Sequence, residues 1–457
     1  MAVTLPALLG EEQRALLAPE GAALLHELRH GLGGPFHVLF PERFDANAAA
    51  FLKVFTGAAV DGRVFYAKKA NKAAVFAERA ALGGLGVDVA SRGELGAALA
   101  AGVRGTGLVV TGPAKDDDLL RAAVLHDALI TVDALDELDR LVCLAAGLGR
   151  TARILLRRLP PTQSGLDHAA PDAAQAQSRF GLDDGELEAA LRRCGDPAVE
   201  LEGFSFHLSG YDVRQRADQA AGLIRLCLRA RGLGLRADRI SIGGGFAVDY
   251  VTARDWRRFH ESARPGHFHA GKTFSGYYPY HSPVAGADAL RAVLETTPVG
   301  ESVPLERLLR RHNISLLVEP GRALLDQAGC SVFRVQGVKD RDGYGILTVD
   351  GTSLSLSEQW FGSEFLPDPV LVPGAREPVP GPYPACVGGA SCLETDLLTW
   401  RKIPFPVRPA AGDLLVYVNT AGYQMDSNES PFHELPLPPK VVVDRLDHAR
   451  PRWRLDR

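Results

Sequence analysis

Residues 64–71 read Val64-Phe65-Tyr66-Ala67-Lys68-Lys69-Ala70-Asn71 and lead into an alanine-rich stretch. The pattern predicts a buried strand that ends at the two lysines and turns into a helix. Burial favours the neutral form of a lysine amine, and a neutral amine can attack a carbonyl. The segment therefore indicates a lysine that forms a Schiff base with an aldehyde. The alternative is an ordinary strand whose end is charged.

Short apolar runs of this kind recur along the chain between stretches with helical periodicity. The first five begin about 21 to 24 residues apart, which is the length of a strand and a helix with short loops. Eight such units predict an α/β fold built on a (β/α)8 TIM-type barrel. The expected strands lie near residues 63–69, 86–90, 108–111, 129–132, 153–158, 204–209, 239–243 and 314–318.

The pattern changes after about residue 325, where strand-like runs alternate with connections rich in proline and glycine. Many of the chain's 30 prolines lie between residues 359 and 410, and few stretches there have helical periodicity. This pattern is typical of an all-β domain with long loops. We therefore expect a barrel over residues 36–325, a C-terminal β domain over residues 326–457, and an N-terminal segment, residues 1–35, that packs on the β domain.

Composition excludes several classes of function. The 457 residues suit two domains, and the net charge of −4 without a basic stripe argues against nucleic acid or an anionic membrane as a partner. The first residues lack the pattern of a secretory signal, and no apolar run is long enough for a membrane span. The six cysteines are scattered, without spacing that indicates a metal site. We expect a cytoplasmic protein without a metal.

Residues 251–285 form an unusual segment between the seventh and eighth expected strands. As a loop after a barrel strand, the segment should lie at the C-terminal face, where active sites form. We expect a lid or a substrate-recognition insertion, and the alternative is a surface insertion that packs its own aromatics. Much of the chain's aromatic and histidine content lies here, namely Trp256, Phe259, His260, His267, Phe268, His269, Phe274, Tyr277, Tyr278, Tyr280 and His281.

Three consecutive glycines, Gly243 to Gly245, follow the seventh expected strand. Without a Cβ, they let backbone N–H groups gather around a phosphate. Barrels favour the loops of their last strands for phosphate sites. A tight turn is the alternative, and the absence of a Walker lysine and of the G-x-G-x-x-G spacing disfavours a nucleotide loop.

Other candidate residues stand at the ends of expected strands. Glu319 begins the sequence Glu-Pro-Gly-Arg after the last strand, and His207 ends the sixth. A carboxylate beside a pyridine nitrogen keeps that nitrogen protonated, which makes the ring an electron sink. The alternatives are a Glu319–Arg322 pair that braces a turn and a structural histidine. Cys392, with Asp396 four residues later, and Tyr423 carry little meaning alone.

Taken in order, these segments resemble the alanine-racemase-like pyridoxal-phosphate enzymes, in particular the branch of diaminopimelate and ornithine decarboxylases. The resemblance covers roughly residues 35–440. It implies pyridoxal 5'-phosphate as the cofactor and an amino acid, a small molecule, as the substrate. It depends on residues 66–71, which match the family's Y-A-x-K-A-N, on residues 88–94, 112–115 and 179–181, and on His207, Gly243 to Gly245, Glu319 to Arg322, Cys392, Asp396 and Tyr423.

The resemblance also implies a role for each residue. Lys69 is the Schiff-base lysine, Lys68 fills the variable position, His207 stacks on the cofactor ring and Glu319 pairs with its nitrogen. Asp88 and Glu94 support the lysine side. The implied cofactor-binding residues are Lys69, Asp88, Arg157, His207, Ser209, Gly243, Gly244, Gly245, Glu319, Gly321, Arg322 and Tyr423.

The family further implies a head-to-tail homodimer with shared active sites. Cys392 and Asp396 would reach the site of the other subunit, where Cys392 would protonate the carbanion after CO2 leaves. Lys69, His207 and Cys392 are thus the implied catalytic residues, and Glu394 and Asp396 the implied substrate contacts.

Three departures from the family concern specificity and the phosphate. The usual His-x-Gly-Ser is replaced by His207-Leu208-Ser209-Gly210, so Ser209 either substitutes from a shifted position or the contact is lost. Leu393 replaces the acid that usually follows the cysteine, with Glu394 one step later. No arginine follows Asp350-Gly351. We therefore expect a decarboxylase of an atypical amino acid or amino-acid conjugate in specialised metabolism.

Two alternatives to a decarboxylase remain. A racemase or epimerase of the same fold is disfavoured by Glu319, because the racemase branch usually places an arginine at the ring nitrogen. A catalytically silent homologue that binds the cofactor or a partner protein is disfavoured by the retention of both Lys69 and Cys392.

Overall fold

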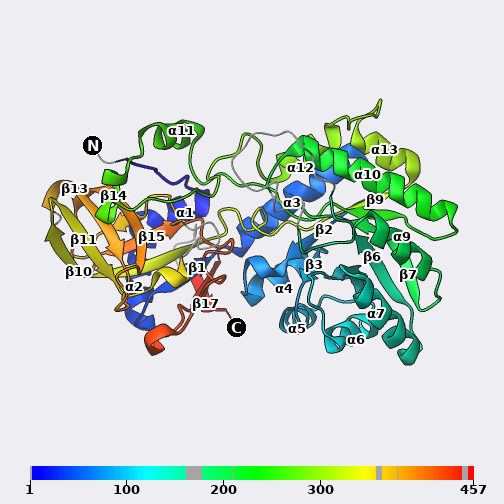
Figure 1. Cartoon of the computed structure of the whole chain (residues 1–457). Helices are drawn as coiled ribbons and strands as arrows, with labels where there is room; N and C mark the ends of the chain where they lie inside the picture. The colour runs from blue at the N-terminus through cyan, green and yellow to red at the C-terminus, as the bar shows by residue number, and fades with distance from the viewer. Residues whose placement is uncertain are drawn as a thin grey trace.

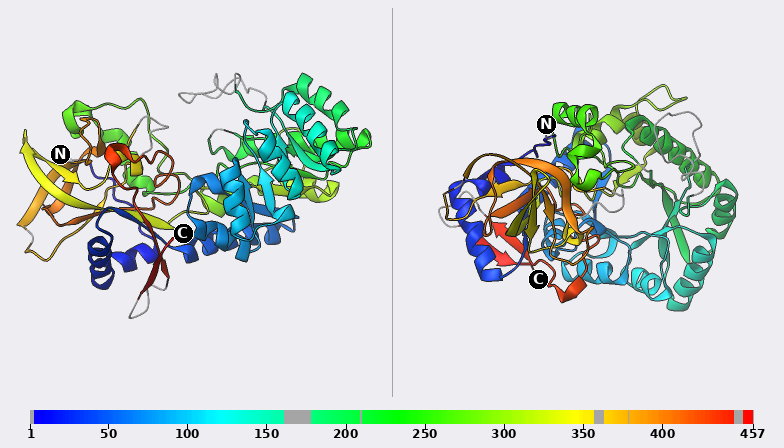
Figure 2. Two further views of the ribbon diagram at one scale, coloured as in Figure 1. Left: turned by 90° about the horizontal axis from the view of Figure 1, so that it is seen from below. Right: turned by 60° about the vertical axis from the view of Figure 1, so that its left-hand side comes forward.

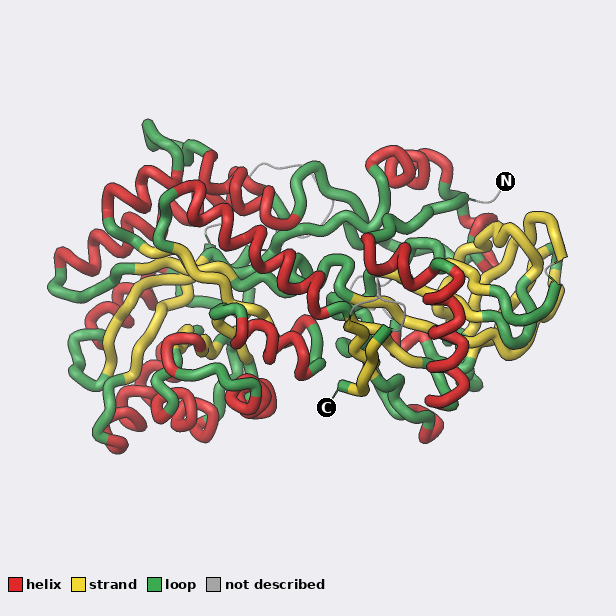
Figure 3. The backbone as a smooth tube through the Cα atoms, turned by 180° about the vertical axis from the view of Figure 1, so that it is seen from behind, coloured by secondary structure: helices red, strands yellow, loops and turns green. Residues whose placement is uncertain are grey.

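The computed structural model has two lobes, a closed barrel and a strand-rich domain, which lie side by side along the long axis (Figure 1). It describes residues 3–160, 178–208, 210–356, 363–377, 379–444 and 451–456. Figure 3 shows the barrel strands enclosed by helices in one lobe and the strand-rich sheet in the other. Within the described residues, no helix has the length and apolar character needed to cross a bilayer.

Eight parallel strands form the barrel, and the last pairs with the first to close it. This confirms the (β/α)8 prediction, with one strand, β7, starting five residues earlier than expected because Val199 to Gly203 also join the sheet. The strands are β2 (Gly62–Ala67), β3 (Gly86–Val89), β4 (Leu108–Val110), β5 (Leu129–Val132), β6 (Ala152–Arg157), β7 (Val199–Ser205), β8 (Arg239–Ser241) and β9 (Ser315–Val318).

Helices form a ring around the barrel (Figure 2, right). Several begin at an N-cap side chain that accepts a hydrogen bond from the backbone, as Ser91, Asp116 and Asp212 do. Their apolar faces pack on the outside of the strands. The barrel helices are α3 (Pro41–Ala58), α4 (Ala74–Leu82), α5 (Arg92–Ala100), α6 (Asp117–Leu125), α7 (Leu135–Leu148), α9 (Asp184–Arg193), α10 (Val213–Gly232), α12 (Gly286–Glu295) and α13 (Leu305–His312).

The second lobe is a mostly antiparallel sheet in the order β14-β13-β11-β10-β1-β16-β17, with β15 pairing β10 and β12. The confirmed all-β character fits the proline-rich composition of this part of the chain. Its strands are β1 (Phe36–Leu39), β10 (Gly329–Arg341), β11 (Tyr344–Val349), β12 (Val370–Val372), β13 (Val379–Gly388), β14 (Leu397–Arg408), β15 (Leu414–Val418), β16 (Lys440–Asp444) and β17 (Arg452–Leu455).

The N-terminal part of the chain belongs to this second lobe. Helices α1 (Glu11–Leu17) and α2 (Pro19–Leu32) bury leucines against the sheet, including Leu25 and Leu28. Strand β1 lies antiparallel to β10 and parallel to β16. The expected barrel boundary at residue 36 is therefore too early, because β1 completes the sheet and the chain enters the barrel only at α3.

The segment 251–285 leaves the barrel and lies on the β domain (Figure 1). Its helix α11 (Ala253–Ser262) is followed by Phe268, which forms a β-bridge with Arg401. The ring of His269 hydrogen-bonds the Tyr344 hydroxyl at 2.8 Å, and Lys402 donates to the Gly266 carbonyl at 3.0 Å. The insertion thus contacts both lobes, since Tyr278 packs on Tyr211 of the barrel and Tyr280 on Phe365 of the β domain.

Candidate active site

An open pocket of about 370 Å³ lies at the C-terminal ends of the barrel strands, where the barrel meets the β domain. The position is the usual one for the active site of a barrel enzyme. The pocket is lined by Lys69, His207, Leu208, Gly210, Tyr211, Gly244, Gly245, Phe246, Tyr278, Glu319, Gly321, Arg322 and Tyr423. Segments distant in sequence, after β2, β7, β8, β9 and β15, are brought together here.

The two adjacent lysines face different surroundings. Lys69 lines the pocket, whereas the Lys68 amine donates to the carbonyls of Asn71 at 3.1 Å and Lys72 at 2.7 Å. Burial lowers the pKa of Lys68 to about 8. Burial acts the same way on Lys69, but Asp88, Tyr423 and Glu319 raise its pKa above the ordinary value. Burial therefore favours the neutral amine at both lysines, but at Lys69 the nearby acids outweigh this effect.

The acids on the lysine side are held by short hydrogen bonds. Asp88 is buried at the end of β3, and the Thr111 hydroxyl donates to its Oδ1 at 2.7 Å. Burial raises the pKa of Asp88, against the effect of Lys69. Glu94 accepts from the Ala90 backbone at 2.7 Å, so it fixes the loop that leads into α5. Glu94 thus supports the site through the backbone.

Arg157 lies at the end of β6 and is fixed by two contacts. Its Nη1 donates to Asp133 Oδ1 at 3.0 Å, and its guanidinium lies 4.6 Å from the centre of the Phe180 ring. The Gly181 backbone donates to the same Asp133 oxygen at 3.2 Å. The Arg-Phe-Gly sequence at 179–181 therefore braces Arg157.

Glu319 is a buried acid at the centre of the pocket. The Ser241 hydroxyl donates to Glu319 Oε1 at 2.6 Å, and burial together with Asp88 raises the pKa of Glu319 to about 7. His207 Nδ1 lies 4.0 Å from Glu319 Oε2, and burial lowers the pKa of His207 well below its usual value. His207 is therefore neutral. Ser241 was missed by the sequence analysis, although it stands two residues before the triple glycine.

The glycines form a cradle that side chains would fill. A Cβ on Gly243, whose φ is 64°, would lie 2.6 Å from the His207 ring. A Cβ on Gly244 would lie 2.8 Å from the Glu319 carbonyl, and one on Gly321 would lie 2.9 Å from the Tyr423 hydroxyl. The Tyr423 backbone donates to the Ala70 carbonyl at 2.8 Å, which joins the β domain to the lysine loop. Only glycine allows this close approach.

Arg322 and Arg216 are two buried cations near the cradle. Arg322 Nη1 donates to the Tyr250 hydroxyl at 2.7 Å, and its guanidinium lies 4.4 Å from the centre of the Tyr278 ring. The insertion thereby contributes Tyr278 to the pocket wall. Arg216 contacts the backbone of the cradle and was missed by the sequence analysis, because an arginine in a helix ordinarily indicates an exposed face. Ser209 lies outside the described residues.

The Cys392 loop is not part of this pocket within one chain. Cys392 is exposed, and its Sγ lies 3.1 Å from His433 Nε2. Glu394 is exposed on the same loop. Asp396 is buried, and its two oxygens accept from the backbones of Ser353 at 2.7 Å and Ser391 at 3.0 Å. This geometry favours a role for Asp396 in shaping the loop, and its contact with substrate in the other subunit's site stays a prediction.

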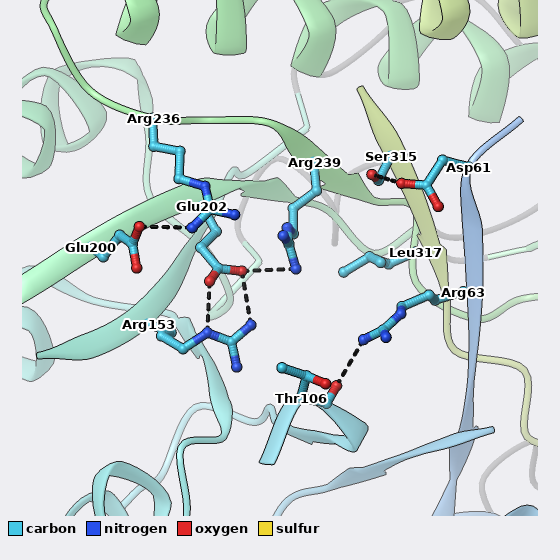
Figure 4. A pocket seen from close by; sticks show the side chains of 10 residues that line it. All are labelled: Asp61, Arg63, Thr106, Arg153, Glu200, Glu202, Arg236, Arg239, Ser315 and Leu317. Carbon is cyan, nitrogen blue, oxygen red and sulfur yellow. Dashed lines mark hydrogen bonds and ion pairs between the residues drawn. The ribbon is translucent and has the colours of Figure 1, made fainter. Parts of the chain in front are cut away.

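A second cavity, of about 440 Å³, lies at the opposite end of the barrel (Figure 4). Most of its charged residues form ion pairs: Glu202 accepts from Arg153 at 2.7 Å and lies 2.9 Å from Arg239, and Glu200 lies 2.7 Å from Arg236. Charges at the N-terminal end of barrel strands ordinarily serve stability. We therefore interpret this larger cavity as part of a barrel end that ion pairs stabilise, and we call it the braced end of the barrel.

A family model described as the pyridoxal-binding domain of pyridoxal-dependent decarboxylases matches residues 42–277. The chain belongs to this family. Pyridoxal phosphate is its cofactor, which confirms the resemblance drawn from the motifs. The pocket fits this cofactor, because it offers an amine, a buried acid and a cradle that a Cβ would fill.

Relatives in sequence cover nearly the whole chain. A protein of Sinorhizobium fredii, named as the uncharacterized protein y4yA, is 36% identical over 453 residues, 98% of this chain and 95% of the relative. A diaminopimelate decarboxylase of Deinococcus radiodurans is 30% identical over 426 residues, 92% of each protein. Both relatives match the chain across its two lobes.

Solved structures agree on the fold. The diaminopimelate decarboxylase of M. jannaschii, in complex with L-lysine, superposes with a TM-score of 0.74 at 18% identity, over 92% of this chain and 89% of that one. A lysine/ornithine decarboxylase of Vibrio vulnificus, in complex with cadaverine, has a TM-score of 0.69 at 18% identity, over 93% and 97%. The barrel and the β domain are therefore the architecture of this family.

Proposed function

We propose that this chain is a pyridoxal-phosphate-dependent decarboxylase of an atypical amino acid or amino-acid conjugate, in specialised metabolism. The observation that carries the proposal is the buried Glu319 in the pocket that Lys69 lines. When bound, pyridoxal phosphate supplies an electron sink for the pair released from the Cα–carboxylate bond. An acid at the ring nitrogen keeps that sink strong, and it disfavours racemisation as the main reaction.

We assign the following roles to the chain's own residues. Lys69 binds the cofactor through its amine. Glu319, aligned by the Ser241 hydroxyl, holds a proton at the ring nitrogen, which its pKa of about 7 allows. The neutral His207 packs on the ring. Gly243 to Gly245, Gly321, Arg322 and Tyr423 hold the phosphate. Asp88 balances the charge of Lys69, and Arg157 acts against that charge.

The proposal of an atypical substrate is supported by the positions that would read the substrate's distal group and by the pocket wall. Leu393, half exposed, occupies the place of an acid that would read a distal amine. Residues 352–356, after Asp350-Gly351, contain no arginine that would read a distal carboxylate. The pocket wall instead includes the pair Tyr211 and Tyr278, whose hydroxyls lie 2.6 Å apart. These features favour a substrate with a less charged or bulkier distal group.

A homodimer with shared active sites is part of the proposal. Cys392 is exposed and carries a hydrogen-bonding imidazole at its thiol, so it is available to a neighbouring subunit. In the shared site, Cys392 would deliver the proton to Cα. Mixing Lys69→Ala and Cys392→Ala chains should restore activity that neither variant has alone. Failure of the mixture, with dimers present, would exclude shared sites.

The experiment that tests the reaction is a panel of amino acids offered to the holoenzyme. The panel includes diaminopimelate, ornithine and lysine, together with aromatic, N-acylated and carrier-bound amino acids. Each mixture is read for loss of CO2 by mass and for loss of optical rotation. Release of CO2 from one member supports the proposal. Loss of rotation without CO2 would identify a racemase, and no change with any member would favour a silent cofactor-binding protein.

A further inference from the structure

Arg216 is a buried cation without a buried anion beside it. It is the fourth residue of α10, and 2% of its surface is exposed. Its guanidinium donates to three backbone carbonyls, those of Ile242 at 2.9 Å, Gly245 at 3.2 Å and Gly210 at 3.3 Å. Among the described residues, no carboxylate forms an ion pair with it. Burial lowers the pKa of Arg216 to about 10, against the effect of Tyr211 and Asp212.

The surroundings make this charge costly in the protein alone. A helix N-terminus carries a positive partial charge, so a cation in the first turn of α10 is unfavourable there. A buried charge that nothing compensates destabilises the folded protein. A negative group within reach of the same loops would remove this cost. The loops that Arg216 holds, at Gly210 and Gly245, line the active-site pocket.

The pocket side of these loops offers backbone donors. The N–H groups of Gly245 and Phe246 have no hydrogen-bond acceptor within the part of the chain that the structure describes. Because a trans peptide is planar, holding the Gly245 carbonyl toward Arg216 turns the Phe246 N–H to the opposite side. Unpaired backbone donors at a buried site ordinarily bind an anion.

We propose that Arg216 is a positioning residue of the phosphate site: it turns the backbone donors after β8 toward the cofactor phosphate and supplies the counter-charge behind them. In this chain the usual His-x-Gly-Ser order is lost, as residues 207–210 show. Arg216 replaces the electrostatic part of that motif from the helix behind the loop. The inference depends on the cofactor and not on the identity of the amino-acid substrate.

The test compares ligands with and without a phosphate on the apoprotein. Pyridoxal phosphate, pyridoxal and inorganic phosphate are titrated into the wild type, Arg216→Met and Arg216→Lys. In Arg216→Met we expect the affinity for pyridoxal phosphate to fall about 10- to 100-fold, as for one hydrogen bond to a charged group, while pyridoxal changes little. Inorganic phosphate should raise the melting temperature of the wild type and not of this variant.

Arg231 provides the matched control at the other end of α10. Its guanidinium also donates to three backbone carbonyls, those of Ala237 at 2.9 Å, His312 at 2.7 Å and Asn313 at 3.1 Å, outside the pocket. Arg231→Met should lower stability and leave the preference for pyridoxal phosphate over pyridoxal unchanged. If Arg216→Met also left that preference unchanged, Arg216 would be merely structural.

If Arg216→Met does not fold, Arg216→Lys tests whether Arg216 positions the phosphate site. Lysine keeps the charge and loses the planar fork that reaches several carbonyls at once. An intermediate preference for pyridoxal phosphate over pyridoxal supports the proposal. A preference equal to that of the wild type, or equal losses for both ligands, overturns it.

Discussion

Lys68 and Lys69 are neighbours in sequence, yet their amines lie on different sides of the turn that ends β2. The turn is a short 3₁₀-helix, Lys68–Ala70, in which successive side chains point about 120° apart. One amine therefore caps the carbonyls of the following loop, and the other faces the pocket. The family motif implies that the cofactor is bound to Lys69, and Lys69 is the lysine of the two that lines the pocket.

Borohydride reduction of the holoprotein can show which of the two lysines holds the cofactor. We predict that reduction fixes the cofactor to Lys69, and that Lys69→Ala abolishes both the fixed cofactor and the visible absorbance. Lys68→Ala should keep both and lower stability by about 1–3 kcal/mol, because it leaves buried carbonyls without a donor. Peptide mass spectrometry locates the modified lysine. A cofactor found on Lys68 would contradict the assignment.

Glu319 should give the apoprotein a pH-dependent stability. Its folded pKa of about 7 lies above its ordinary value of 4.5, so the folded state favours the protonated acid. This contribution is fully present below pH 4.5 and is lost as the pH rises through 7. Relative to Glu319→Gln, the wild type should lose about 3 kcal/mol of unfolding free energy over this range.

Urea unfolding of both apoproteins between pH 4.5 and pH 8 measures this difference. Ser241→Ala provides a further check, because it removes the hydroxyl that stabilises the Glu319 carboxylate. Its stability should therefore decline more steeply with pH than that of the wild type. A difference between the wild type and Glu319→Gln that does not change with pH would show that Glu319 is ionised throughout.

The braced end of the barrel makes a prediction about stability alone. Glu202 is 1% exposed between Arg153 and Arg239, whereas Glu200 is 39% exposed beside Arg236. Glu202→Gln should cost about 3–5 kcal/mol, because two arginines lose a buried partner. Glu200→Gln should cost at most about 1 kcal/mol. Urea unfolding measures both, and equal costs would contradict the distinction between the two pairs.

Gly321 should be required for the phosphate side of the pocket. A Cβ at this position would lie 2.9 Å from both the Tyr423 hydroxyl and the Ala70 Cβ. Gly321→Ala should displace Tyr423 and weaken pyridoxal-phosphate binding about 10-fold, because overpacking costs about 1–3 kcal/mol. Gly276→Ala, in the insertion, is the matched control, since a Cβ there meets nothing within 4 Å. Fluorescence titration of the apoproteins measures both affinities, and an equal effect would refute the prediction.

The sequence by itself determined the barrel, the β domain and the order of the motifs around the pocket. Apolar runs that alternate with amphipathic helices follow from local periodicity, so the eight strands could be predicted from the order of the residues alone. The motif at residues 66–71 carried the family, because its residue types recur at fixed spacing. Glu319 and His207 could be predicted to lie at the pocket because each stands at the end of an expected strand.

Only the tertiary structure decided which side chains meet. It placed β1 in the β domain and laid the insertion across both lobes. It also brought Ser241 to Glu319 and Arg216 to the loops that line the pocket. It also separated the exposed Cys392 from the pocket of its own chain. Local patterns fix the period of burial, but the direction of a buried polar side chain depends on partners that can lie far away in the sequence. From the sequence alone, Arg216 is predicted to lie on the exposed face of a helix, and only the structure shows its three carbonyl partners.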